Sequence, residues 1–213
     1  MRMVTSRDEP RAVPGRRSVL MQSLELALQR HARVEEPDDA GLRWAAVALV
    51  LRGTTVDDAD LLFIRRAVRA GDPWSGHVAF PGGRMDVADA SLEITARRET
   101  REELALDLDA HARLLGALDD LRPRAAVLPS IAVRPYVFAL HADVTLVPNE
   151  EEVQSTFWVP VQQLLDPAST MEHVFDRGGS RFRFPAYRSG DDVVWGMTER
   201  LVTQLLSVAR VSV

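Results

Sequence analysis

Three glutamates lie on one face of a predicted helix. Glu99, Glu102 and Glu103 occur in the segment ARRETREELAL, residues 96–106, at positions i, i+3 and i+4. Residues at these spacings share one side of an α-helix, where like charges weaken the helix. A bound divalent cation would reverse that effect, and oxygen ligands suit Mg²⁺ or Mn²⁺, which also contact phosphate oxygens. The spacing therefore indicates a metal site, and Arg98, four residues before Glu102, could pair with that glutamate and orient it.

The same segment could instead be a solvated helix face with ordinary ion pairs between neighbouring turns. The sequence FPGG at residues 80–83 favours the metal site, because a backbone carbonyl in a tight glycine turn can serve as a ligand. The separation between Gly83 and Glu99 allows this turn to fold back against the helix.

Composition narrows the class of protein. The chain has 213 residues, of which 46% are hydrophobic, enough for one domain or two small ones with a sizeable core. It has no cysteine, which excludes a thiol nucleophile and a thiolate metal site.

The charged residues limit the possible partners. A net charge of −5 argues against a general nucleic-acid binder. Every basic residue is arginine, so cationic contacts to phosphate must come from arginine, histidine or metal. Without an apolar run of about 18 residues or a secretory signal, we expect a cytoplasmic protein that is not membrane-bound.

Hydrophobic patterning predicts a mixed α/β domain of the α+β type, because the elements do not alternate regularly. Residues 1–36 are expected to form an arm and a helix, and residues 37–213 the domain. We expect Asp89 and Thr198 to cap helices, residues 42–66 to form a hairpin, and Pro135 to mark a bulge or an edge strand. The predicted helices are 18–33, about 90–104, 161–165 and about 198–209, and the predicted strands are 42–51, 61–66, 77–80, 112–118, 131–140, 157–160, around 175, and 181–187.

The helix and the glycine turn together resemble the Nudix box, G-x5-E-x7-R-E-U-x-E-E-x-G-U. Gly83, Asp89 and RETREELAL, residues 98–106, carry the resemblance, which extends from about Gly41 to Arg210. The chain departs from the box in three ways: the interval from Gly83 to Arg98 is one residue longer, Asp89 replaces a glutamate, and Ala105 replaces a glycine. The resemblance implies the Nudix fold, with mixed β-sheets between helices.

Further segments resemble the coenzyme A pyrophosphatase branch of that family: HVAFPGGRMD, DAS, FWVP, FPAY and WGMT. This branch also carries an upstream motif, L-L-T-x-R-S-x3-R-x3-G-x3-F-P-G-G. Leu61, Leu62, Arg65 and Gly76 match that motif, whereas Phe63 and Arg66 replace its threonine and serine, and its second arginine falls out of register. These departures bear on the substrate and leave the expected fold unchanged.

The resemblance implies a role for each site residue. Glu99 and Glu103 would be the main Mg²⁺ ligands with Glu102 assisting, the Gly82 carbonyl would complete the ligand set, and Arg98 would orient the glutamates. The base that takes the proton from water would be a helix glutamate, Glu102 or Glu103, or one of Glu150, Glu151 and Glu152, of which we favour Glu152. Arg65 and Arg66 would contact a substrate phosphate. His77 could approach the metal or be structural, and Trp74 and Phe80 could stack on adenine or belong to the core.

Three functions stay open at this point. The first is Mg²⁺-dependent cleavage of coenzyme A or acyl-coenzyme A to 3′,5′-ADP and 4′-phosphopantetheine, with Mn²⁺ as a substitute cation. The second is hydrolysis of ADP-ribose or another nucleoside diphosphate derivative. The third is a catalytically silent nucleotide-sensing domain, against which the repulsive glutamate cluster weighs. The expected partner is thus a small nucleoside diphosphate compound, and a homodimer is a further option.

Overall fold

The computed structural model describes residues 19–72, 74–123, 130–177 and 180–210. Its main sheet is mixed and seven-stranded, with the order β3-β2-β1-β6-β5, while β4 pairs with β1 and β7 pairs with β2. The predicted α+β class is confirmed. The strands are β1 (Arg43–Arg52), β2 (Asp60–Arg66), β3 (Val78–Ala79), β4 (Gly82–Arg84), β5 (Ala112–Ala117), β6 (Ile131–Leu140) and β7 (Val153–Pro160).

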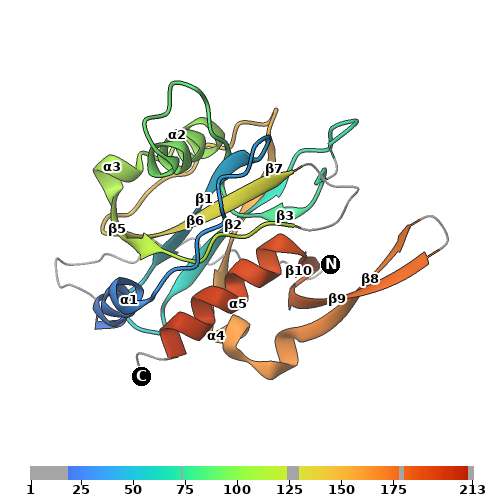
Figure 1. Cartoon of the computed structure of the whole chain (residues 1–213). Coiled ribbons are helices and arrows are strands. Elements are labelled where there is room, and N and C mark those ends of the chain that lie inside the picture. The colour runs from blue at the N-terminus through green and yellow to red at the C-terminus, as the bar shows by residue number, and fades with distance from the viewer. Residues whose placement is uncertain (1–18, 73, 124–129, 178–179, 211–213) are drawn as a thin grey trace.

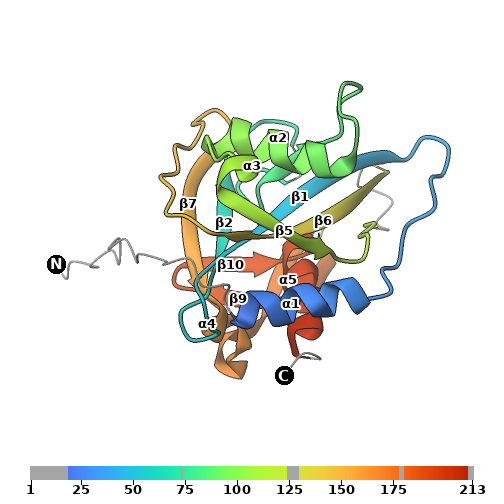
Figure 2. The same cartoon turned by 90° about the vertical axis from the view of Figure 1, so that its left-hand side faces the viewer.

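Helices cover both faces of this sheet (Figure 1; Figure 2). On one face lie α2 (Leu92–Leu104) and the short α3 (Leu108–His111), and on the other lie α1 (Val19–Arg30) and α5 (Met197–Arg210). Strand β1 is buried on both sides: Leu49 belongs to the core with α1 and α5, and Val50 to the core with α2. This explains its continuous apolar run, because a strand covered on both faces has no polar side.

A second, three-stranded sheet contacts β3 of the main sheet and α5. It has the order β10-β9-β8, from β8 (Thr170–Arg177), β9 (Ser180–Ser189) and β10 (Asp192–Trp195). The β8–β9 hairpin projects from the rest of the molecule (Figure 1), and β10 runs next to β3. The short helix α4 (Val161–Leu165) and a 3₁₀ turn (Pro167–Ser169) connect the two sheets.

The predicted hairpin of residues 42–66 is only partly correct. Strands β1 and β2 pair at two positions, Leu51 with Leu61 and Arg52 with Asp60, next to their turn. Beyond the turn, β4 occupies the edge of β1, and β2 pairs with β7 along its length. The prediction of an edge position for Pro135 is wrong, because β6 lies between β1 and β5. A bulge does occur nearby, in β5 between Leu114 and Gly116.

Two predicted helix caps are also wrong. The N-cap of α2 is Ser91, whose side chain accepts a hydrogen bond from the Ile94 N–H. Asp89 instead faces Arg98. Thr198 lies inside the first turn of α5, where its hydroxyl donates to the Val78 carbonyl and fastens the helix to β3.

The N-terminal segment is joined to the domain core through α1. Met21, Leu24 and Leu28 are buried in the cluster that also contains residues of α5 and β5. The predicted arm, residues 1–16, and Ser18 lie outside the described residues. Within the described ranges, no helix has both the length and the apolar character required to cross a membrane.

Candidate metal centre

Helix α2 places two glutamates toward the glycine turn that precedes it. Glu99 and Glu103 are four residues apart and therefore nearly aligned along the helix. The helix ends at Ala105, which takes φ 53° and whose N–H donates to the Arg101 carbonyl. This is the left-handed conformation that glycine adopts most easily. Ala105 therefore ends the helix in the conformation expected of the glycine that the Nudix box has at this position.

Carboxylate oxygens of Glu99, Glu103 and Glu152 lie within 4.8 Å of one another. Glu103 is only 2% exposed, and its Oε2 accepts a hydrogen bond of 2.8 Å from the Gly82 N–H. Glu152 comes from the loop before β7. That loop is fastened to the end of α2, because the Asn149 N–H donates to the Glu103 carbonyl at 2.8 Å and the Val147 N–H to the Leu104 carbonyl at 2.9 Å.

The two glycines of β4 allow the close approach of strand, helix and cluster. An added Cβ on Gly83 would lie 2.4 Å from the carboxyl carbon of Glu99. An added Cβ on Gly82 would lie 2.2 Å from the Ala46 carbonyl oxygen, and Gly82 also has φ +147°, a value that side chains disfavour. Gly83 therefore makes room for the glutamate, and Gly82 makes room for the neighbouring strand.

Arg98 connects the cluster to the loop before α2. Its guanidinium makes ion pairs with Glu99 at 3.0 Å and Glu102 at 2.8 Å. It also donates to both oxygens of Asp89, at 3.0 and 2.9 Å, and to the Arg84 carbonyl at 3.1 Å. The hydrogen bond from Arg98 holds the pKa of Asp89 below its usual range. Asp89 thus anchors Arg98, which suits the predicted role of Arg98 in orienting the glutamates.

Burial works against negative charge in the cluster. It raises the pKa of Glu103 to about 8, with the Glu99 and Glu152 charges adding to the effect and the Gly82 hydrogen bond opposing it. Burial also raises the pKa of Glu99, although Arg98 opposes this. Glu99 and Glu103 therefore resist ionisation, and their convergence with a third carboxylate oxygen fits a hard divalent cation, because its charge would stabilise the ionised carboxylates.

The remaining site glutamates lie apart from this cluster. The Glu102 side chain is 54% exposed and pairs with Arg98, so its predicted help in metal binding has no support from the geometry of the described cluster. Glu150 and Glu151 are exposed, and of these three neighbouring glutamates Glu152 points into the centre. The predicted ligand role of the Gly82 carbonyl stays a prediction, since the described contact of Gly82 is through its N–H.

Arginines of the β2–β3 region stand beside the centre. Arg66 binds Asp72 at 2.8 Å, its buried Nε lacks a hydrogen-bond partner, and its charge lowers the pKa of Glu103. Arg69 lies 3.8 Å from a Glu152 oxygen. Arg65 pairs with Asp192 of β10 and donates to the Gly76 carbonyl at 3.0 Å. Both predicted phosphate contacts, Arg65 and Arg66, thus already have carboxylate partners.

Sequence reasoning missed two supporting residues. Asp89 was taken for a helix cap, although its match to the acidic position of the Nudix box was the signal for a role in the site. The sequence could not indicate Asn149, because Asn149 contributes through a backbone hydrogen bond to α2 and not through its side chain.

The two aromatic residues that could have stacked on adenine have other contacts. Phe80 belongs to the core, where it stacks on Phe63 with ring centroids 4.9 Å apart, and Trp74 packs against a small apolar cluster.

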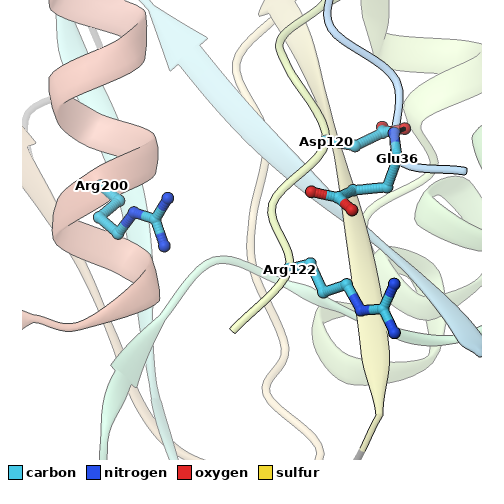
Figure 3. Close-up of a pocket in the computed structure, with 4 residues that line it drawn as sticks. All are labelled: Glu36, Asp120, Arg122 and Arg200. Atoms are coloured by element: carbon cyan, nitrogen blue, oxygen red, sulfur yellow. Dashed lines mark hydrogen bonds between the residues drawn. The ribbon is translucent and has the colours of Figure 1, made fainter. Parts of the chain in front are cut away.

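A separate polar pocket of about 250 Å³ lies between α5 and the segment after β5. Figure 3 shows Arg200 on the helix facing Asp120, Arg122 and Glu36. Asp120 is bound by Arg134 at 2.8 Å, and Arg122 pairs with Asp39 at 2.6 Å. Because Asp120 is already paired and two of the four lining residues are arginines, this pocket lacks the converging carboxylates of a cation site.

Comparison with known proteins agrees with the geometry of the centre. Residues 41–177 match the family model described as the NUDIX domain. An uncharacterised protein from Schizosaccharomyces pombe is 40% identical over 110 residues, which is 50% of this chain and 33% of that protein. The human mitochondrial coenzyme A diphosphatase NUDT8 is 38% identical over 142 residues, 65% of this chain and 58% of that protein. The chain thus spans less than two thirds of the length of these two relatives.

Among solved structures, a MutT/nudix family protein from Enterococcus faecalis has a similar fold. Its TM-score is 0.53 at 16% identity, with 92% of this chain and 71% of that chain covered. At this identity the likeness supports the fold alone.

Proposed function

The chain belongs to the Nudix family, and from this premise we propose that it hydrolyses a phosphoanhydride bond in a nucleoside diphosphate derivative with the help of a divalent cation. The observation that carries the proposal is the convergence of the Glu99, Glu103 and Glu152 carboxylates within 4.8 Å. A silent nucleotide-sensing domain would gain nothing from this cluster, because burying like charges together costs stability.

Each residue of the centre has a part in this chemistry. Mg²⁺, or Mn²⁺ in its place, would supply charge neutralisation of the diphosphate and acidification of water. Glu99 and Glu103 would hold the cation, and Arg98, itself held by Asp89, keeps Glu99 in place. Glu152 faces the same space from another element, where it could accept the proton of the attacking water. The positive charges of Arg66 and Arg69 lie near Glu103 and Glu152, where they would face the phosphates of a bound diphosphate.

We further propose coenzyme A or acyl-coenzyme A as the substrate, with cleavage to 3′,5′-ADP and 4′-phosphopantetheine. Support comes from the similarity to a coenzyme A diphosphatase and from Leu61, Leu62 and Arg65 in the upstream motif. Arg65 and Arg66 are the candidates for the 3′-phosphate, which arginine binds through charge-assisted hydrogen bonds. Because Phe63 and Arg66 depart from the motif, ADP-ribose is the comparison substrate.

The test compares coenzyme A, dephospho-coenzyme A and ADP-ribose at equal Mg²⁺. We expect coenzyme A to give the highest kcat/KM, and Arg65→Ala to remove its advantage over the dephospho form. Asp192→Asn is the matched control, since it breaks the same ion pair but keeps the arginine. A clear preference for ADP-ribose would overturn the coenzyme A assignment and leave the Nudix chemistry intact.

A second measurement tests the chemistry itself. Glu103→Gln keeps the shape of the side chain and removes a ligand charge, so we expect turnover to fall roughly 10³-fold. Near-normal turnover of this variant at saturating Mg²⁺ would falsify the role of Glu103. If the unaltered protein cleaves no diphosphate at all, the silent nucleotide-sensing function becomes the better explanation. Cytoplasmic location and a homodimer stay predictions from the sequence.

A further inference from the structure

A row of rings covers one face of the small sheet, next to β3. Trp195 of β10 lies at its centre, with ring centroids 4.9 Å from His77 and 4.5 Å from His173. Phe175 and Phe184 are 5.4 and 5.6 Å from Trp195, and Phe182 continues the row, 6.5 Å from Phe184. We call this set the ring face: His77, His173, Phe175, Phe182, Phe184 and Trp195.

The strand register places these rings on the same side of the sheet. His173 is opposite Phe184, and Phe175 is opposite Phe182; directly opposed residues of antiparallel strands share a face. The other side of the hairpin carries the ion pairs Glu172–Arg183 and Asp176–Arg181. The hairpin is therefore amphipathic.

The ring face is partly open to solvent. Phe182 is 47% exposed, and the other rings of the row are half-buried. The β8–β9 hairpin, which bears His173 and the three phenylalanines, projects from the rest of the molecule (Figure 1). Aromatic surface that is exposed in a continuous row, rather than as single side chains, is typical of a binding surface.

The inner end of the ring face adjoins the metal centre. His77 accepts a backbone hydrogen bond of 3.0 Å from the Arg66 N–H, and the Arg66 side chain acts on Glu103. Asp72, the partner of Arg66, also receives the Trp74 N–H at 3.0 Å. Arg66 is thus the residue that links the glutamate cluster to the inner end of the ring face.

We propose that the ring face binds the nucleobase of the substrate by stacking. The proposal rests on the proposed function, since it locates one part of the nucleoside diphosphate compound. The rings are in contact with one another, at centroid distances of 4.5–5.6 Å, so they form one aromatic surface against which a base can pack, and stacking on aromatic side chains is a general way of holding a base. Two imidazoles at the inner end add hydrogen-bonding edges, which a base can use and an apolar acyl chain cannot.

The test uses two probes that lack a phosphoanhydride bond and so are not hydrolysed: AMP and ribose 5-phosphate, which differ only in the base. Calorimetric titration in Mg²⁺ is expected to show AMP binding roughly 10-fold or more tightly than ribose 5-phosphate. Phe184→Leu, which removes a ring and keeps apolar bulk, is expected to erase most of this difference. Equal affinities of the two probes for the unaltered protein overturn the proposal.

Two exposed positions of the hairpin provide a matched pair of variants. Phe182→Ser alters the ring face, whereas Val174→Ser alters the opposite face at a similar exposure, 44% against 47%. We expect Phe182→Ser to weaken AMP binding several-fold without changing ribose 5-phosphate binding, and Val174→Ser to change neither. An equal effect of both variants on AMP contradicts the proposal.

Hydrolysis assays separate this inference from the proposed function. With a cleaved substrate, Phe184→Leu is expected to raise KM and leave kcat nearly unchanged. If Phe184→Leu raises KM for acyl-coenzyme A but leaves AMP affinity unchanged, the ring face holds an acyl chain and the proposal is overturned. If no diphosphate is cleaved but AMP affinity still depends on Phe184, the inference stands and the proposed function fails.

Discussion

At the scale of single residues, glutamates with the same chemistry have different contacts, because their positions on the fold differ. Glu99 and Glu103 face the cluster, while Glu102 lies about 100° around the helix from Glu103 and pairs with Arg98. Glu152 reaches the same centre from a loop, unlike the exposed Glu150 and Glu151. In the proposed function, Glu152 would act on water from outside the helix while the helix glutamates hold the cation.

Glu152→Gln tests this division of work. We expect turnover to fall by about 10²- to 10⁴-fold, the contribution typical of a general base, with the Mg²⁺ concentration for half-maximal activity nearly unchanged. Rate against Mg²⁺ concentration is the measurement, and Glu150→Gln and Glu151→Gln are the controls. A large shift in Mg²⁺ dependence would instead make Glu152 a ligand. Full activity in all three variants would move the base to Glu102 or Glu103.

At the scale of elements, the centre depends on how closely β4 approaches α2. Gly83 lies against the Glu99 carboxylate, and Gly82 lies against the backbone of β1. The two adjacent glycines therefore serve different purposes, one for the site and the other for the sheet. Replacing each by alanine should separate the two effects.

Gly83→Ala should impair function with little loss of stability. Its Cβ would overlap the end of a flexible side chain, so Glu99 moves out of the cluster while the backbone stays. We expect Mg²⁺ affinity to fall at least about 10-fold and the free energy of unfolding to change by less than about 1 kcal/mol. Gly82→Ala, which meets backbone atoms, should cost about 2 kcal/mol or more. Equal stability losses in both variants, measured by denaturant unfolding, would contradict this assignment.

The sequence predicts local features of these elements well and long-range ones poorly. The span of β6 and the end of α2 agree with expectation, since each is set by a continuous run of residues. The pairing of β2 with β7 could not be predicted, because it joins segments far apart in the chain. The prediction of Asp89 as a cap is wrong for a related reason: its position before the helix suits a cap, and its partner Arg98 lies nine residues further along the chain. Glu99 and Glu103 could be predicted because their spacing places them on one side of a single helix.

At the scale of the whole molecule, burying carboxylates in the candidate metal centre lowers the free energy of unfolding of the domain. Glu103 is buried between sheet and helix with Glu99 and Glu152 nearby, although each would be better solvated in the unfolded chain. Burial of the ionised form disfavours folding, and in the proposed function the binding of a cation to the folded state would compensate for it. Stability, metal and pH are therefore linked through the same cluster.

In metal-free buffer the free energy of unfolding should fall as pH rises from about 4.5 toward 8. Burial raises the pKa of Glu103 from 4.5 to about 8 on folding, so the folded state binds the extra proton and loses that advantage as the proton leaves. Glu103→Gln should flatten this decline and be the more stable protein at pH 8 in EDTA. His77, whose pKa burial lowers, titrates in both proteins, so its contribution to the pH dependence of stability cancels in the comparison.

Added Mg²⁺ should raise the unfolding temperature of the unaltered protein at pH 8 more than that of the variant. Thermal unfolding at pH 5 and pH 8, with EDTA or Mg²⁺, is the measurement, and parallel pH profiles for the two proteins would contradict the linkage.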